Sequence, residues 1–293
     1  MYNNCTVGHY WKEKFGEKVY RISIDGGFTC PTRDGTKGYG GCYFCDEKGS
    51  TTHKNELSYS IEEQIKNGMS RLRKKGINKF IAYFQSYTNT YAPVNILRKR
   101  YFSAFIDEDI VGISVSTRPD CINEENVKLL NEISDEHYTI VELGIQTVHQ
   151  HSLDLLGRKH SVLDSEKAVK MLNKKSGIEV VAHVILGLPG ETKQDMLDTA
   201  KFISEWGIDG IKLHHLYIVE NTPFAREFKK GNIKVFEEAE DYAEVAREFL
   251  ENLPDNIIIH RFSGYARGER LIAPYWTCNR HIARDLILKG VKI

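Results

Sequence analysis

Three cysteines, Cys30, Cys42 and Cys45, have the spacing in this 293-residue chain that points most directly to chemistry. Eleven residues separate the first thiol from the second, and two separate the second from the third. Four glycines lie between the first two thiols: Gly35, Gly38, Gly40 and Gly41. Glycine tolerates positive φ and has no side chain, so this backbone can wrap closely around a bulky group. Because iron–sulfur clusters are normally held by four cysteine thiolates, three thiols without a fourth nearby predict a cubane cluster with one open iron.

Zinc, disulfides and buried free thiols are the alternative interpretations of this loop. Zinc needs a fourth ligand, which Cys5, His9 or His53 could supply, although none of them belongs to a second Cys-x-x-Cys or His-x-x-x-His pair. Three clustered cysteines cannot all pair in disulfides, and the first residues have no basic-then-apolar secretory leader. Buried free thiols would leave the glycines unexplained. The iron–sulfur interpretation is therefore favoured.

Short β-branched runs alternate with longer amphipathic stretches along most of the chain. The predicted strands are Val19–Asp25, Lys79–Phe84, Ile110–Ser116, Thr139–Ile145, Glu179–Leu186 and Gly210–Tyr217. The predicted helices between them span residues 60–75, 94–105, 123–134, 163–175 and 192–206. Strands that alternate with helices indicate βαβ units and a parallel sheet, so we expect an α/β protein.

Residues with chemical potential follow the predicted strands. The cysteine loop comes after the first strand, and the residues at the ends of the other five are Gln85, Ser116, Gln146, Gly187 and Tyr217. In βα barrels the active site is assembled at the carboxyl ends of the strands. We therefore expect these segments to meet at the end of the barrel that carries the thiols.

The cysteine loop, Phe44 before its last cysteine, and these strand-end segments resemble the radical S-adenosylmethionine (SAM) superfamily. The resemblance covers about residues 15 to 265 and is strongest to a short bacterial branch related to the catalytic subunit of Elongator. The first cysteine gap is longer than the common Cys-x3-Cys-x2-Cys spacing, a departure familiar in the Elongator-like group. The resemblance implies a partial (β/α)6 TIM-like barrel followed by a small C-terminal extension.

The resemblance also implies the cofactors. Cys30, Cys42 and Cys45 would hold three irons of a [4Fe–4S] cluster, and the open iron would bind SAM. One electron from a donor of the flavodoxin or ferredoxin type would cleave SAM to a 5′-deoxyadenosyl radical, and the protein would supply orientation and a dry pocket.

Ten residues are implied as SAM contacts by their match to the superfamily pattern. They are Phe44, Gln85, Ser86, Ser116, Gln146, Arg158, His183, Ile185, Leu216 and Tyr217. Gln85 and Ser86 would replace a Gly-Gly-Glu stretch that binds the SAM amino group. Gln146 and Arg158 resemble the pair that bonds the ribose and carboxylate, and His183 occupies a ribose-contact position. The other implied contacts include three adenine-contacting positions: the backbone of Phe44, Ile185, and the segment Leu216–Tyr217.

Several of these polar residues could instead have structural roles. Gln85 fits an ordinary polar loop, and His183 fits a hydrogen-bonded core histidine. Arg118 either binds a carboxylate or phosphate or pairs with Asp120. Glu142 lies within a predicted strand, where a carboxylate must be paired. It is either an interior or substrate-contacting acid, or the partner of Lys212 or an arginine.

Adjacent histidines occur at positions 214 and 215. Neighbouring residues of a strand face opposite sides, so only one of the two can line the barrel. Cys5, Cys121 and Cys278 are scattered, which argues against a second iron–sulfur cluster.

Two units are predicted: a radical SAM core over residues 1–225 and a C-terminal α/β extension over 226–293 packed on that core. The extension is expected to contain a helix over Phe236–Leu250, an added strand over Ile257–Phe262 and a last helix over Cys278–Leu288.

Charge is balanced over the whole chain, with 40 basic and 40 acidic residues, so no global field recruits nucleic acid. No stretch approaches the apolar length of a membrane span, and a cytoplasmic protein is expected. Locally, residues 260–293 hold seven Lys or Arg against two Asp or Glu.

These basic residues, with the Elongator-like resemblance, point to tRNA as a substrate, at a wobble-uridine side chain. The basic candidates are Arg261, Arg267, Arg270, Arg280, Arg284 and Lys289, together with Arg71, Arg73, Lys74 and Lys75. Tyr265, Tyr275 and Trp276 could stack on bases. The competing hypotheses are a radical SAM enzyme acting on a protein, peptide or small metabolite, and a non-catalytic zinc-binding barrel.

Overall fold

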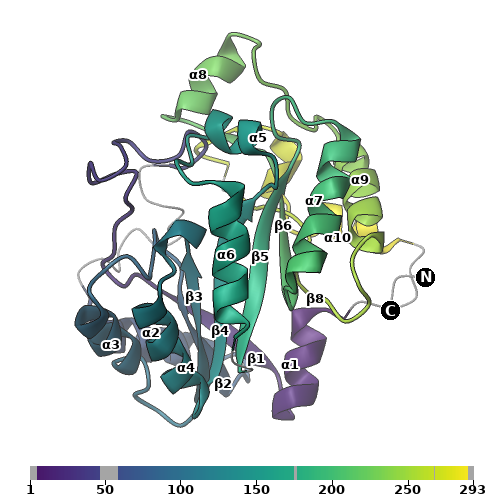
Figure 1. The fold of residues 1–293 in the computed structure, drawn as a ribbon. Coiled ribbons are helices and arrows are strands. Elements are labelled where there is room, and N and C mark those ends of the chain that lie inside the picture. The colour runs from purple at the N-terminus through teal and green to yellow at the C-terminus, as the bar shows by residue number, and fades with distance from the viewer. Residues whose placement is uncertain (1–4, 47–58, 175–176, 267, 290–293) are drawn as a thin grey trace.

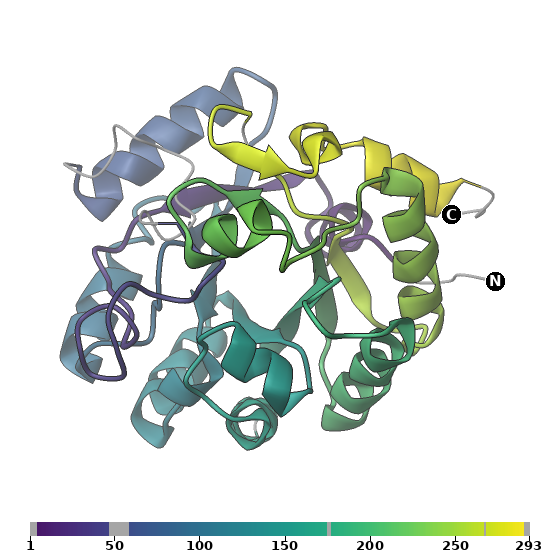
Figure 2. The same ribbon diagram turned by 90° about the horizontal axis from the view of Figure 1, so that it is seen from above.

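A seven-stranded parallel sheet forms the centre of the molecule in the computed structural model, which describes residues 5–46, 59–174, 177–266 and 268–289. The strands follow the order β1-β2-β3-β4-β5-β6-β8, and each neighbouring pair is parallel. Their bounds are β1 Val19–Ile24, β2 Lys79–Phe84, β3 Ile110–Thr117, β4 Tyr138–Gln146, β5 Ile178–Leu186, β6 Gly210–His215 and β8 Ile258–Arg261. The sheet curls into an open barrel with helices around its outer face (Figures 1 and 2). The predicted α/β partial barrel is confirmed.

Alternation along each strand divides the apolar core from the barrel interior. In β4, Val141, Leu143 and Ile145 pack into the main core beneath the helices. Glu142, between Val141 and Leu143, has the opposite orientation and lies in the interior, where its carboxylate meets Lys212 of β6. The two-residue period therefore explains how one strand serves both a packed core and a polar interior.

The outer layer consists mainly of five helices. They are α2 Ile61–Arg73, α3 Val94–Phe102, α4 Glu124–Ser134, α6 Val162–Leu172 and α7 Lys193–Trp206. Four of them begin with a reciprocal capping box, led by Ser60, Asn123, Ser161 and Thr192. Each box satisfies two backbone donors that a helix start would leave free, so the point at which each helix begins is fixed locally.

The amino end of the barrel is closed by an apolar floor. Trp11, from α1 (Val7–Phe15), packs with Val19, Ile81, Ile140 and Val181 from the strands. Figure 1 shows α1 beneath the strands, at the end opposite α8 (Pro223–Lys229). This helix was not predicted, and it leaves the carboxyl end of the barrel as the place where a site can open.

The C-terminal part completes the sheet and covers one side of it. β8 pairs with β6, so the sheet has seven strands because the predicted added strand joins its edge. α9 (Ala239–Glu251) packs against α7 and against α10 (Ile282–Leu288). The division into two units at residue 225 stays a prediction.

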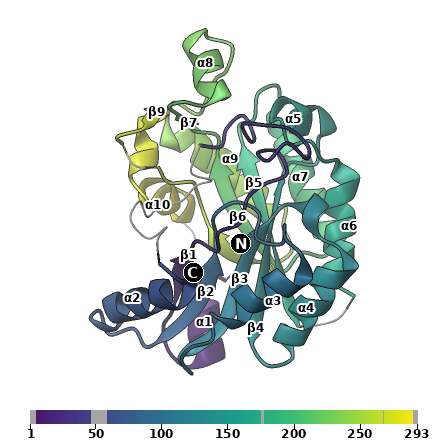
Figure 3. The same ribbon diagram turned by 90° about the vertical axis from the view of Figure 1, so that its left-hand side faces the viewer.

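Short elements surround the carboxyl ends of the strands. β7 (Ile218–Val219) and β9 (Leu271–Ala273) form an antiparallel pair, and α8 (Pro223–Lys229) projects above it (Figure 3). The remaining elements are α5 Gln150–Leu155 and the 3-10 turns η1 Pro119–Cys121 and η2 Tyr275–Cys278. None of these was predicted as a separate element, and the last helix begins at Ile282, later than the predicted start at Cys278. No helix in the described ranges has the length and apolarity to cross a membrane.

Candidate active site

The cysteine loop lies over the carboxyl ends of the strands. It leaves β1 and runs beside α5 and α8 (Figure 3). Tyr43 anchors it on both sides, because its N–H donates to the carbonyl of Leu156 at 3.0 Å and its own carbonyl accepts from Phe224 at 3.1 Å. The segment is therefore tied to two separate elements of the barrel mouth rather than standing free.

Local backbone geometry explains why glycine is needed beside the second thiol. Gly41 has a φ of 84°, in the left-handed region that other residues avoid. A Cβ at this position would lie 2.8 Å from the guanidinium of Arg33. Gly41 thus lets Arg33 fold back over the loop, and its backbone N–H donates to Thr32 at 2.9 Å.

Each of the three sulfurs meets a hydrogen-bonding side chain. Arg33 donates to Sγ of Cys45 at 3.4 Å, and Arg158 donates to Sγ of Cys42 at 3.5 Å. The Sγ of Cys30 shares a hydrogen bond with the hydroxyl of Thr88 at 3.0 Å. Donors directed at sulfur stabilise the thiolate form, which is the form that binds metal.

Burial opposes ionisation of the free thiols. It raises the pKa of Cys30, and it raises the pKa of Cys45 to about 12, although Arg33 acts in the other direction. A coordinating metal deprotonates a thiol outright. The loop is therefore matched to a group that brings positive metal charge to the sulfurs.

The donor set fits a cluster better than a single ion. Three sulfurs are soft ligands suited to iron–sulfur clusters. No group of three or more His, Cys, Asp or Glu side chains in the described ranges is arranged to hold one metal ion. In a cubane each thiolate binds a different iron, so the sulfurs need not converge on one point. The Nε of Arg158 is also buried without a partner, beside Cys42.

The fourth ligands considered for zinc are not near the loop. The backbone of Cys5 accepts a hydrogen bond from Ile259 of β8, and His9 pairs with Glu13 on α1, both at the amino end of the barrel. His53 lies outside the described residues. Cys5 and His9 are thus wrong as partners of the cysteine loop.

Three of the predicted adenine contacts come together beside the thiols. Phe44, Ile185 and Leu216 belong to one apolar cluster with Leu156 and Phe224. They derive from the cysteine loop, β5 and the end of β6, which the sequence separates widely. This cluster forms an apolar wall next to Cys45.

Gln146 and Arg158 also lie together. A Cβ on Gly144 would lie 2.9 Å from Nε2 of Gln146 and 3.1 Å from Nη2 of Arg158, so both side chains cross this glycine. Arg158 donates to the carbonyl of Gly144 at 2.5 Å. Gln146 has a φ of 72°, a strained conformation for a residue with a side chain and a common one at functional sites.

The remaining predicted contacts lie at neighbouring strand ends. The N–H of Gln85 donates to Ile24 at 3.3 Å, and Ser86 is buried. Ser116 is tied to the loop after β2, because its carbonyl accepts from the side chain of Asn89 at 2.8 Å. Tyr217 follows β6, and a Cβ on Gly264 would lie 2.8 Å from its ring.

Glu142 is the hub of a polar layer inside the barrel. Its carboxylate contacts Lys212 at 2.5 Å, Arg21 at 3.0 Å and Nε2 of His183 at 3.0 Å. Hydroxyl groups complete the shell: Tyr83 at 2.7 Å, Ser116 at 2.9 Å and Ser114 at 3.1 Å. Six of the seven strands thus contribute to one carboxylate.

The electrostatics of this layer are well defined. Burial alone would raise the pKa of Glu142, yet Lys212 and Arg21, with a hydrogen bond from His183, hold that pKa well below its usual value. Burial lowers the pKa of His183 to about 4, with Lys212 adding to the effect. Glu142 is therefore a carboxylate and His183 a neutral imidazole at neutral pH. Both roles considered for Glu142 hold: it is an interior acid, and it is paired with Lys212 and an arginine.

Contacts also decide the roles of Arg118 and of the two adjacent histidines. Arg118 forms two hydrogen bonds to Asp120, at 2.9 and 3.0 Å, so the structural pair is present. His214 faces the interior and stacks on His183, with ring centroids 5.7 Å apart. His215 faces outward and hydrogen-bonds to Thr277 at 2.7 Å.

Several residues proposed for RNA contact are already engaged within the protein. Arg261 lies in the interior beside His214 at 3.4 Å, and not on the surface. Trp276 packs on His215 with ring centroids 4.0 Å apart, and Tyr265 lies under Arg280 at 4.0 Å. Arg270 reaches Asp46 of the cysteine loop at 3.5 Å, and Arg267 lies outside the described residues.

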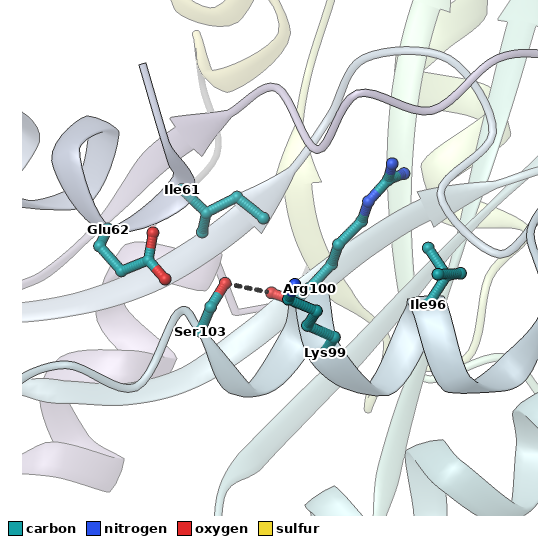
Figure 4. A pocket seen from close by; sticks show the side chains of 6 residues that line it. All are labelled: Ile61, Glu62, Ile96, Lys99, Arg100 and Ser103. Atoms are coloured by element: carbon teal, nitrogen blue, oxygen red, sulfur yellow. Dashed lines mark hydrogen bonds between the residues drawn. The ribbon is translucent and has the colours of Figure 1, made fainter.

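A pocket between α2 and α3 lies on the outer side of the barrel (Figure 4). It is lined by Ile61, Glu62, Ile96, Lys99, Arg100 and Ser103. None of the predicted site residues belongs to it. Arg100 points its guanidinium over Phe28, 4.4 Å from the ring centroid, and so supports the segment that leads to the cysteine loop.

Comparison with known proteins agrees with this arrangement. Residues 36–203 match the Radical SAM superfamily, and residues 208–288 match the Radical_SAM C-terminal domain. The Bacillus subtilis (strain 168) protein YtqA is 40% identical over 278 residues, which is 94% of this chain and 85% of YtqA. The chain belongs to the radical SAM superfamily. Members of this superfamily bind a [4Fe–4S] cluster and SAM.

Two further comparisons concern an Elp3 structure and a tRNA acetyltransferase. The structure of Methanocaldococcus infernus Elp3 with an N-terminal deletion has a TM-score of 0.69 and 20% identity, and covers 94% of this chain and 64% of its own. The M. infernus tRNA uridine(34) acetyltransferase is 30% identical over 189 residues, which is 62% of this chain and 31% of the relative. The predicted Elongator-like resemblance is confirmed, and the Elp3 comparison supports the radical SAM fold.

Sequence reasoning missed several side chains of this radical SAM site. Arg33 and Thr88, which contact the sulfurs, were not selected, although Arg33 lies between two predicted ligands. Arg21 and Tyr83 bind Glu142 and were also missed. The sequence did indicate Arg21 and Tyr83, because each is a charged or hydroxyl residue at an inward position of a strand.

Proposed function

We propose that this protein is a cytoplasmic radical SAM enzyme that modifies a tRNA at the side chain of a wobble uridine. The likeness to a tRNA uridine(34) acetyltransferase over 189 residues carries the tRNA part of the proposal. The enzymatic part rests on the cysteine loop, where three thiols and the arginines that contact them stand at the barrel mouth. Because the likeness spans only 31% of that relative, the proposal takes from it the kind of substrate and not the acetyl transfer.

The thiolates of Cys30, Cys42 and Cys45 hold the cluster in this proposal. When bound, the cluster and SAM together supply a 5′-deoxyadenosyl radical after one-electron reduction. Arg33 and Arg158 donate hydrogen bonds to two of the sulfurs and offset the negative charge that thiolates bring. The hydroxyl of Thr88 forms a hydrogen bond with the third sulfur, that of Cys30.

The ten predicted contacts orient SAM in three groups. Phe44, Ile185 and Leu216 present an apolar surface to the adenine. Gln146 and Arg158 hold ribose and carboxylate oxygens. Both side chains cross over Gly144, so their polar ends lie close together. The other five lie at strand ends and in the interior: Gln85, Ser86, Ser116, His183 and Tyr217.

An external reductant delivers the electron, and a flavodoxin- or ferredoxin-type protein is the proposed donor. The cysteine loop reaches solvent, since Tyr39 within it is 83% exposed. Cys42 is buried and Cys30 and Cys45 are half-buried, so water is limited at the thiols while the outer surface of the loop remains accessible.

Exposed groups near the C-terminus are suited to contact RNA. Tyr275 is 86% exposed and offers a flat ring for stacking on a base. Arg284, on α10, is also exposed. Phosphate contacts of this kind give affinity that falls with salt.

Anaerobic incubation with SAM, a reductant and bulk tRNA tests the proposal, followed by nucleoside analysis of the tRNA. We expect a modified uridine that depends on SAM and on Cys42. 5′-Deoxyadenosine formation without any altered nucleoside would overturn the tRNA part and favour a protein, peptide or small metabolite. Affinity for tRNA that is indifferent to salt and to Arg284→Gln would do the same.

A further inference from the structure

Basic side chains outnumber acidic ones in the polar layer of the barrel. Arg21 and Lys212 share the single carboxylate of Glu142, at 3.0 and 2.5 Å. Arg261 adds a third cation from β8. A second acid, Glu179, lies lower and is engaged with His260 at 2.9 Å and with Tyr138. Buried charges are costly unless paired, so this excess calls for a further anion.

Arg261 is the cation that lacks a counter-ion. In the described parts of the chain it has no acidic partner, and its Nη1 faces Nε2 of His214 at 3.4 Å. A guanidinium can only donate, so this nitrogen of His214 carries no proton. Burial and the charge of Arg261 hold the pKa of His214 well below its usual value, which agrees with a neutral ring. The pair therefore presents unneutralised positive charge.

Within the layer, the carboxylate of Glu142 is less accessible than most of the side chains that donate to it. The side chain of Glu142 has no accessible surface and that of Lys212 has 1%, whereas Arg21 and His183 keep 16% and 18%. His214 and Arg261 are also only partly buried. The atoms of the layer that remain reachable thus belong mainly to groups that donate hydrogen bonds, while the one carboxylate is sealed.

This donor surface lies next to the predicted SAM contacts. A Cβ on Gly264 would lie 2.8 Å from the ring of Tyr217 and 3.3 Å from Nδ1 of His214, so one backbone segment touches both side chains. Tyr217 is within electrostatic range of Arg261 and of Cys45. His183, which stacks on His214, is itself a predicted ribose contact.

We propose that Arg261 and His214 bind an anionic group of the substrate, a carboxylate or a phosphate, inside the barrel. The inference rests on the proposed function and adds to it the chemistry of the group that enters the site. Arg261 offers two parallel donors to such an anion, which a planar carboxylate or a phosphate matches. Arg21 and Lys212 add positive charge behind it without contacting it.

Anion binding to the holoenzyme with SAM tests this directly. Acetate and inorganic phosphate serve as probes, acetamide is the neutral match for acetate, and chloride keeps the ionic strength constant. The measurement is the midpoint of thermal unfolding against probe concentration. We expect a saturable rise with acetate or phosphate and none with acetamide. The anion that reaches half of its effect at the lower concentration identifies the bound group of the substrate as a carboxylate or a phosphate.

Variants assign the effect to the residues. Arg261→Gln should raise the concentration needed for half-saturation at least about tenfold, since it removes a charge-assisted pair. Arg261→Lys should retain part of the response. Arg98→Gln removes a surface arginine paired with Glu132 at 2.5 Å and should respond as the native protein does. If Arg261→Gln fails to fold, His214→Asn provides the same comparison.

Equal responses to acetate and acetamide, or an unchanged response in Arg261→Gln, would overturn the inference. The same variants separate it from the tRNA proposal. An Arg261-dependent anion response in an enzyme that modifies no tRNA supports the anion site and removes tRNA as the substrate. Equal tRNA modification by native enzyme and Arg261→Gln, without an anion response, removes the anion site and leaves the tRNA proposal standing.

Discussion

The cysteine loop and the polar layer beneath it are built in opposite ways. The loop gathers its thiols within sixteen consecutive residues, on irregular backbone that depends on glycine. The layer collects single side chains from strands that span residues 21 to 261, on regular backbone. The loop is bound to the barrel by a few hydrogen bonds, whereas Glu142 in the layer accepts from six side chains. The proposed cofactor site is thus a local motif, whereas the polar interior below it is formed by the sheet as a whole.

This difference separates the expected effects of mutation. Changes in the layer should cost stability, because buried charges lose their partners. Changes in the loop should cost cofactor retention and leave the barrel folded. Three predictions test this contrast, from the largest expected effect to the smallest.

Glu142→Gln should lower the free energy of unfolding by about 3–5 kcal/mol, because it leaves Lys212 and Arg21 buried without a counter-charge. Urea unfolding followed by circular dichroism measures the loss. Glu132→Gln is the matched control, since its exposed pair with Arg98 should contribute little. Equal effects of the two substitutions would contradict the structural importance of the layer.

Acid should destabilise the fold through histidines that are held neutral. Burial lowers the pKa of His183 to about 4, of His215 to about 3 and of His160 to about 2. The unfolded chain binds protons near pH 6.5, so stability is complete above that value and falls as the pH drops toward 4. Each histidine should contribute roughly 1 kcal/mol of loss between pH 7 and 5.5.

Urea unfolding of the metal-free protein at several pH values measures this slope. His215→Gln should reduce the slope by roughly a fifth, because the pKa values of His214 and His260 are lowered as well and one of five such groups is removed. His9→Gln changes an exposed residue and should leave the slope intact. A flat stability profile across this range would show that the buried imidazoles take up protons in the folded state.

Gly41→Ala should weaken cluster retention with a loss of stability of only about 1–2 kcal/mol. The left-handed φ of 84° accounts for that strain, and the added Cβ meets Arg33 at 2.8 Å. Iron and sulfide content after brief exposure to air is the measurement. Gly76→Ala is the matched control: its φ is 73°, but nothing lies within 4 Å of the added Cβ. Equal iron loss in both variants would remove the special role of the loop backbone.

The loop could be predicted well from the sequence, and the layer only poorly. Cys30, Cys42 and Cys45 are close in the chain, so their chemistry is readable before folding. The six main strands were also predictable, because β-branched runs alternate with amphipathic helices; β2 has the predicted bounds, and β6 ends two residues early at His215. Glu142 was recognised as an acid that needs a partner, and Lys212 was among the partners considered.

The rest depended on how the sheet curls. Arg21 and Tyr83 approach Glu142 only because β1 and β2 stand across the barrel from β5 and β6. Arg261 was taken for a surface cation, since nothing in a basic C-terminal sequence shows that β8 joins the sheet and turns that side chain inward. Trp276 was likewise hidden by packing against His215.

The most direct test of the account is the formation of 5′-deoxyadenosine by anaerobically purified protein given SAM and a reductant. The native protein and Cys278→Ala should both produce it, because Cys278 lies outside the loop. Cys42→Ala should bind less iron and produce none above the background of heat-inactivated protein. Undiminished production by Cys42→Ala would contradict the assignment of the three thiols as the cluster ligands.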